Sequence, residues 1–146
     1  MRVERRIVLP TPPAGAWVVL VDWERQSDWM PDADEVRVTS AAREGVGTTL
    51  DVKTRVLNVP LFTERLEVVG WDPPRELRIA HRSFIRGQGT WTLTPAGTGT
   101  RFRWIEDLSL PVPLLGGLAL LVYRPFMRHL MGRAMRDLRA YVGSVP

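Results

Sequence analysis

The stretch YRPFMRHLMGRAMRDLRAY, residues 123–141, carries the clearest periodic pattern in the chain. At about 100° per residue, its apolar side chains fall in one arc and its arginines in the opposite arc. The apolar arc contains Tyr123, Phe126, Met127, Leu130, Met131, Ala134, Leu138 and Tyr141, and the basic arc contains Arg124, Arg128, Arg133, Arg136 and Arg139. This pattern predicts a C-terminal helix that covers an apolar surface, with a kink or a restart near Pro125, because proline removes a helix hydrogen bond.

The surface to be covered is predicted by the segments before this helix, in which apolar and polar residues alternate with the period of two that is typical of strands. Strands are expected at 2–9, 35–42, 48–58, 61–71, 76–82, 90–95 and 100–108. Thr11 followed by two prolines predicts the start of a short helix, and Pro31 should end a second one near Trp29. Short turns join the later strands, and Gly87 and Gly89 precede the strand at 90–95, so an antiparallel meander and an α+β class are expected.

Composition indicates one domain over residues 1–146, with 45% hydrophobic and 25% charged residues. The absence of cysteine excludes disulfides and zinc–thiolate sites. No stretch resembles a signal peptide or a membrane span, so a cytoplasmic location is expected. The net charge is +4, but acids are interspersed among the bases, so nucleic-acid binding is not expected.

Few residues suggest a particular chemistry. The chain has two histidines and no HExxH motif, so neither a metal site nor a cofactor is expected. It also lacks a serine-hydrolase elbow and a phosphate-binding loop. Four polar residues, His81, Glu106, Glu64 and Thr54, fall on the apolar side of their predicted strands. An ionisable group there would have a shifted pKa, and His81 with Glu106 could act as an acid and a base. The alternatives are structural: an inward histidine near the sheet edge, and a glutamate paired with an arginine at the open end.

The order of these elements and several motifs resemble one protein superfamily. The motifs are LPTPPAGAWVVLVDWERQSDWMPD at 9–32, REGVGT at 43–48, WDPPREL at 71–77 and WTLTPAGTGTRFRW at 91–104. Together with the C-terminal helix they resemble the SRPBCC superfamily, also called START-like or helix-grip proteins. The chain looks most similar to its bacterial polyketide cyclase/dehydrase and lipid-transport group.

The resemblance implies a curved antiparallel sheet of about seven strands, in the order β-α-α-β6-α, that grips the C-terminal helix around a cavity for an apolar or aromatic ligand. The residues expected to contact that ligand are Trp29, Val52, Leu66, Ile79, His81, Trp91, Phe102, Trp104, Glu106, Phe126 and Leu130. Trp23 and Trp29 would anchor the two short helices, either as core residues or, for one of them, at the border of the pocket.

Three functions remain open from the sequence. The first is binding or transport of a hydrophobic small molecule such as a lipid, an isoprenoid or a polyketide-like aromatic. The second is a cyclase/dehydrase-type enzyme with His81 and Glu106 as acid–base candidates. The third is a quinone- or ribosome-associated interaction module that uses the arginine face of the helix. The apolar run at 112–122 favours a connection tucked under the sheet, and the alternative is peripheral membrane contact through 112–126.

Overall fold

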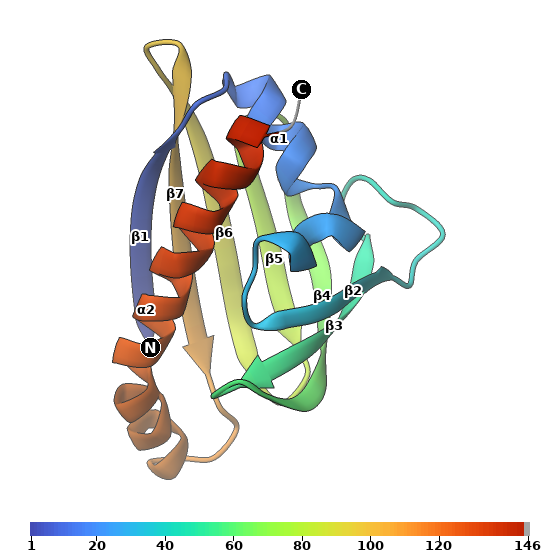
Figure 1. Ribbon diagram of the computed structural model, residues 1–146. Coiled ribbons are helices and arrows are strands. Elements are labelled where there is room, and N and C mark those ends of the chain that lie inside the picture. The colour runs from blue at the N-terminus through green and yellow to red at the C-terminus, as the bar shows by residue number, and fades with distance from the viewer. Residues whose placement is uncertain (145–146) are drawn as a thin grey trace.

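The structure is a computed structural model and describes residues 1–144. The strands are β1 (Arg2–Leu9), β2 (Ala33–Val38), β3 (Thr49–Val56), β4 (Val59–Asp72), β5 (Glu76–Arg82), β6 (Arg86–Ala96) and β7 (Gly99–Ser109). The helices are α1 (Pro13–Leu20), the 3-10 helix η1 (Trp23–Asp28) and α2 (Leu115–Ser144). The predicted order of elements is therefore confirmed (Figure 1).

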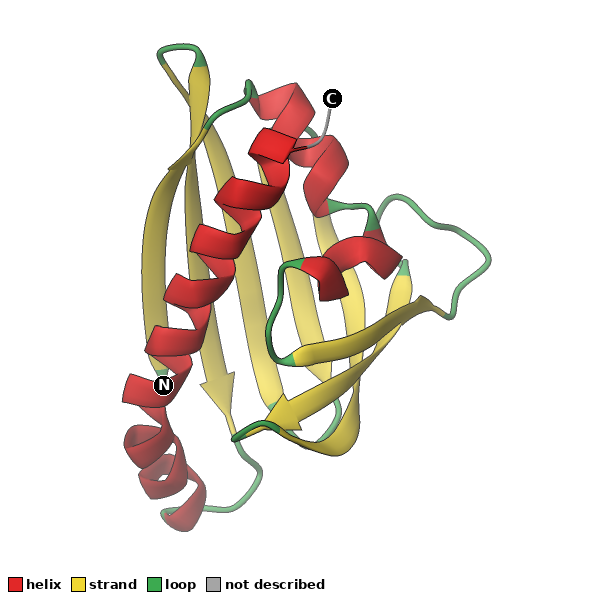
Figure 2. Cartoon of the chain, in the orientation of Figure 1, coloured by secondary structure: helices red, strands yellow, loops and turns green. Residues whose placement is uncertain are grey.

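All seven strands form one antiparallel sheet in the order β1-β7-β6-β5-β4-β3-β2. The sheet curls around α2, which lies across its concave side, and the predicted α+β helix-grip fold is confirmed (Figure 2). Because β1 pairs with β7, the N-terminal strand forms one edge, and β2 forms the other.

The amphipathic pattern of the C-terminal helix is confirmed. Met131, Ala134 and Leu138 are buried against the sheet, whereas the five arginines of the basic arc are exposed. The helix runs without a break through Pro125, so of the two predicted alternatives the restart is wrong. The first turns of α2 lie at an angle to the rest of the helix, which agrees with the predicted kink (Figure 1). Proline leaves the carbonyl four residues earlier without its helix partner, but Leu121 and Pro125 are both exposed and water can hydrate this group.

Two arginines of α2 fasten the helix to the edge strand. Arg124 Nε donates to the carbonyl of Arg2 at 3.0 Å, and Arg128 Nη1 donates to the carbonyl of Glu4 at 3.1 Å. The outward carbonyls of an edge strand otherwise bind only water, and they can pair with a strand of another chain. Two of the five arginines of the basic arc therefore bind the helix to β1.

The tryptophans near the N-terminus form two aromatic groups in the core. Trp23 is fully buried, donates from Nε1 to the carbonyl of Arg43 at 2.9 Å and lies 6.5 Å from Trp71 between ring centroids. Trp29 is equally buried and its ring lies 6.0 Å from that of Trp91 on β6. Trp29 is thus a core residue that supports the cavity from behind.

Some predicted boundaries differ from the structure. Thr11 is not the N-cap of α1, because Pro12 occupies that position and no side chain caps the helix. Gly87 and Gly89 lie within β6 and not before it. The second difference matters for the site, because a glycine inside a strand leaves room for a neighbouring side chain.

Candidate functional site

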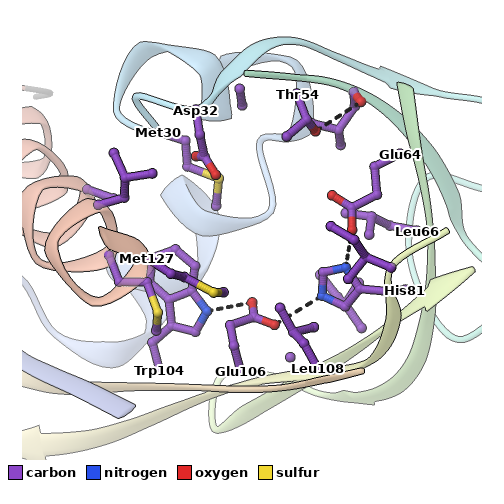
Figure 3. A pocket seen from close by; sticks show the side chains of 18 of the residues that line it. Met30, Asp32, Thr54, Glu64, Leu66, His81, Trp104, Glu106, Leu108 and Met127 are labelled. Atoms are coloured by element: carbon purple, nitrogen blue, oxygen red, sulfur yellow. Dashed lines mark hydrogen bonds and ion pairs between the residues drawn. The ribbon is translucent and has the colours of Figure 1, made fainter. Parts of the chain in front are cut away.

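A cavity of about 160 Å³ lies between the concave face of the sheet and α2. Strands β3 to β7, the segment from η1 to β2, and α2 all contribute side chains to its wall. Most of these side chains are apolar. Three of the ionisable ones, Glu64, His81 and Glu106, lie on the sheet side, and Asp32 faces them from the η1–β2 loop. Figure 3 shows this arrangement, with Met127 on the helix side and His81 on the far side.

Three polar side chains form a connected cluster on the cavity wall. His81 on β5 lies between Glu64 on β4 and Glu106 on β7, and all three are largely buried. The Nδ1 atom of His81 contacts Glu64 Oε1, and Nε2 lies 3.0 Å from Glu106 Oε2 (Figure 3). Trp104 Nε1 donates to Glu106 Oε1 at 2.8 Å, so both oxygens of Glu106 accept a hydrogen bond.

Gly89 makes this cluster possible. Strand β6 separates β5 from β7, and Gly89 is paired with Ile79 on one side and with Glu106 on the other. A Cβ atom at position 89 would lie 2.7 Å from Glu106 Oε1 and 3.0 Å from Oε2. The carboxylate of Glu106 therefore occupies the space that the side chain of any residue other than glycine would fill at position 89. In this position it extends across β6 and contacts His81.

The two carboxylates keep His81 protonated. Burial alone would lower the pKa of the imidazole, but the hydrogen bonds and charges of Glu106 and Glu64 outweigh it and raise the pKa to about 10. At neutral pH both ring nitrogens therefore donate. Because this pKa lies above the ordinary value of 6.5, the protonated cluster stabilises the fold below about pH 6.5, and this stabilisation is lost as the pH rises through about 10.

Asp32 is a fourth ionisable group of the cavity, and the sequence did not single it out. It lies in the loop between η1 and β2, and its carboxyl group faces the cavity opposite His81 and Glu106 (Figure 3). Burial raises its pKa to about 6, with further contributions from the negative charges of Glu64 and Glu106. Its position at the end of the motif WMPD, directly before a strand, was the signal available in the sequence.

Most residues expected to contact a ligand do line the cavity. These are Val52, Leu66, Ile79, His81, Trp91, Trp104, Glu106 and Leu130. Trp29 and Phe102 do not, because they are buried in the layer behind and pack against Trp91. Phe126 lies in a separate depression beside Leu57 and His129, since Met127 and Leu130 take the inward positions of the helix.

The structural alternatives for the polar residues hold in part. His81 is an inward histidine with a partner at each ring nitrogen, as expected. His81 belongs to β5, a central strand, and not to the sheet edge. Glu106 is paired with His81 and Trp104, and not with an arginine.

The segment 112–122 is not tucked under the sheet. Leu114 is 92% exposed and Val122 is 74% exposed, and α2 has already begun at Leu115. Other exposed apolar side chains in and around this segment are Val112, Leu115, Leu118 and Leu121. The interpretation as a buried connection is therefore wrong, because the first turns of α2 extend beyond the sheet that buries the rest of the helix (Figure 1).

Over residues 1–144, no group of His, Cys, Asp or Glu side chains is arranged to hold a metal ion. The cluster itself is unsuited to one, since both nitrogens of His81 are directed at carboxylates. Across residues 1–144, none of the helices has the combination of length and hydropathy that a membrane span requires.

Comparison with solved structures finds the same fold in other proteins. A START superfamily protein from Mycobacterium smegmatis superposes with a TM-score of 0.78 at 12% identity, over 99% of both chains. The Zhui aromatase/cyclase from Streptomyces sp. R1128 gives 0.71 at 18% identity, over 95% of this chain and 94% of the other. A protein from Thermus thermophilus gives 0.80 at 23% identity, over 99% of this chain and 100% of the other.

A family profile gives a finer assignment. The profile of the polyketide cyclase/dehydrase and lipid transport family matches residues 1–143, and the chain belongs to this family. No curated protein matches the chain.

The role of Gly89 can be tested through the pKa of His81. In Gly89→Ala the added methyl group overlaps the carboxylate of Glu106, so we expect the pKa of His81 to fall by about one unit or more. The measurement is an NMR titration of the imidazole, assigned with His81→Gln. Gly117→Ala is the matched control, because a Cβ at position 117 meets open space. A His81 pKa near 6.5 in the unchanged protein, or one that Gly89→Ala leaves unaltered, would contradict the argument.

Proposed function

We propose that the protein binds a compact apolar molecule of one or two rings in the cavity between the sheet and α2. The observation that carries the proposal is an interior space with a mainly apolar wall to which the sheet, the helix and the η1–β2 segment all contribute. Membership of a family described by polyketide cyclisation and lipid transport supports an apolar ligand in general terms.

The size of the cavity favours a ring over a long-chain lipid. A dry cavity of roughly 150 Å³ holds one benzene molecule in another protein, and the space here is about 160 Å³. The rings of Trp91 and Trp104 lie 5.9 Å apart at 83° on the wall, and together they present both a face and an edge to a flat ligand.

Apolar contact alone would give weak binding. A ring that buries about 150 Å² gains about 4 kcal/mol at about 25 cal/mol per Å², which corresponds to a dissociation constant of about 1 mM before other costs. The polar groups of the wall therefore decide which ring binds well.

Binding can be tested with naphthol and a variant that fills the cavity. Leu66 on β4 lines the cavity, and in Leu66→Trp the larger ring should occupy the space and abolish naphthol binding in isothermal titration calorimetry. Leu61→Trp is the matched control on the same strand, because Leu61 is exposed and outside the cavity. Thermal unfolding verifies that both variants fold. Absence of binding to the unchanged protein, or equal binding by Leu66→Trp, would refute the proposal.

The hydrogen-bonded cluster favours a second candidate, acid–base catalysis in the same cavity. Protonated His81 can donate a proton, and Asp32 can accept one because its pKa of about 6 is near the working pH. On a β-hydroxyketone, Asp32 would take a proton from the carbon between the carbonyl carbon and the hydroxyl-bearing carbon. His81 would give up one of its hydrogen bonds to a carboxylate and protonate the departing hydroxyl group. The products are water and a conjugated enone.

This reaction can be followed by the ultraviolet absorbance of the enone formed from the adduct of acetone and benzaldehyde. Asp32→Asn and His81→Gln should each lower turnover by about a hundredfold, the usual contribution of a positioned acid or base. The control is Glu67→Gln, since Glu67 lies outside the cavity wall and pairs with Arg82. Undetectable turnover, or turnover that neither substitution changes, would refute acid–base catalysis by Asp32 and His81.

The exposed apolar turns of α2 support peripheral membrane contact through 112–126 as an additional proposal. Residues 108–136 contain no acidic side chain, and Arg124 and Arg128 adjoin the exposed leucines. We expect cosedimentation with phosphatidylglycerol vesicles that Leu118→Glu weakens and that Val18→Glu, on the exposed side of α1, leaves unchanged. Cosedimentation that Leu118→Glu does not weaken would contradict it.

A further inference from the structure

The charge of the cavity is opposite to the charge of the chain. The protein carries 20 lysine and arginine residues against 16 acidic ones. Among the described residues 1–144, however, those that line the cavity include Asp32, Glu64 and Glu106 and neither lysine nor arginine. The cavity thus lacks the side chains with which proteins usually bind carboxylates and phosphates.

His81 does not reverse this charge. Its two ring nitrogens are both directed at carboxylates, so Glu64, His81 and Glu106 together carry one net negative charge. Asp32 adds a second when it ionises. Burial and the charges of Glu64 and Glu106 raise the pKa of Asp32 and so oppose its ionisation. The same effects would destabilise the ionised carboxylate of a ligand in this cavity.

The polar groups that remain free in the cavity are mainly acceptors. Gln26 Nε2 donates to the carbonyl of Leu20 at 2.8 Å, and Trp104 Nε1 donates to Glu106. Over residues 1–144, no protein group donates a hydrogen bond to Glu64 Oε2. Tyr123 on α2 also lines the cavity, with its phenol group. Burial, together with the nearby Asp32, raises the pKa of this phenol.

We propose that the cavity selects a ring molecule that bears a hydrogen-bond donor, as a hydroxyl or an amino group, and that it rejects ligands with a carboxylate or a phosphate. The donor would bind the free oxygen of Glu64 or the carboxyl group of Asp32, which face the cavity from different sides (Figure 3). A donor is selected because a buried acceptor left without a donor costs free energy. This inference rests on the proposed ring-binding function and deepens it.

Four matched probes test the selection: naphthalene, naphthol, naphthylmethylamine as a cation and naphthoate as an anion. Their affinities are measured with the full chain by isothermal titration calorimetry at about pH 7.5, where Asp32 is mostly ionised. Naphthol and the amine should bind about tenfold more tightly than naphthalene, because each adds a hydrogen bond to a charged acceptor. Naphthoate should bind about tenfold more weakly than naphthalene, since like charges in a poorly solvated space repel.

Two changes should weaken the rejection of the anion. Asp32→Asn removes one negative charge and leaves the Glu64–His81–Glu106 cluster intact, so naphthoate affinity should rise by about tenfold and amine affinity should fall. Glu67→Gln, outside the cavity wall, is the control and should change neither. Lowering the pH to about 5 protonates Asp32 in the unchanged protein, so naphthoate affinity should rise there without any substitution.

The outcomes separate the two proposals. Binding of naphthalene together with equal or tighter binding of naphthoate would overturn the charge selection and leave the ring-binding cavity standing. Equal affinity for all four probes would do the same. If none of the four probes binds, the proposed function fails and this inference fails with it. Tighter binding of both donors with rejection of naphthoate supports it, and the stronger of the two donors identifies a hydroxyl or an amino ligand.

Discussion

A single helix covers only part of the concave face of a curved seven-stranded sheet, and the cavity follows from this constraint. Helix α2 packs mainly against β1 and to a lesser extent against β7. Arg124 and Arg128 fasten it to the carbonyls of the β1 edge. The concave face of β3 to β6 therefore lacks a full cover, and the space between it and the helix is lined by apolar side chains that do not meet.

The buried ionic cluster is the second determinant of the site. Moving charges from water into the interior of a protein is costly, and a buried ion pair is retained only when its groups are mutually satisfied. Here each ring nitrogen of His81 meets a carboxylate, and Trp104 satisfies the second oxygen of Glu106. The arrangement leaves one free oxygen on Glu64 and a net negative charge, and both face the place where a ligand would lie. The same contacts that stabilise the cluster thus set the polarity of the cavity.

The periodic parts of the fold were predictable, because alternation and helical spacing directly record which face of an element is buried. The order of elements, the antiparallel sheet and the buried arc of α2 are confirmed. The pattern failed where burial does not follow local spacing. Most of residues 112–122 are apolar but exposed, because whether an apolar turn is covered depends on how far the sheet extends beneath it. Phe126 is displaced from the cavity for a related reason, since the exact rotation of α2 gives the inward positions to Met127 and Leu130.

The sequence by itself determined that His81 and Glu106 lie on the apolar side of their strands, because strand alternation is a local property. Only the tertiary structure decided that they meet, since β6 lies between their strands and the contact requires the absence of a side chain at Gly89. Alternation also predicted the face of Glu64, and the tertiary structure decided only that it meets His81. The place of Asp32 in the same cavity was decided by the position of the η1–β2 loop. Strand pairing and sheet curvature bring together residues that are far apart in the chain, and no local pattern encodes that proximity.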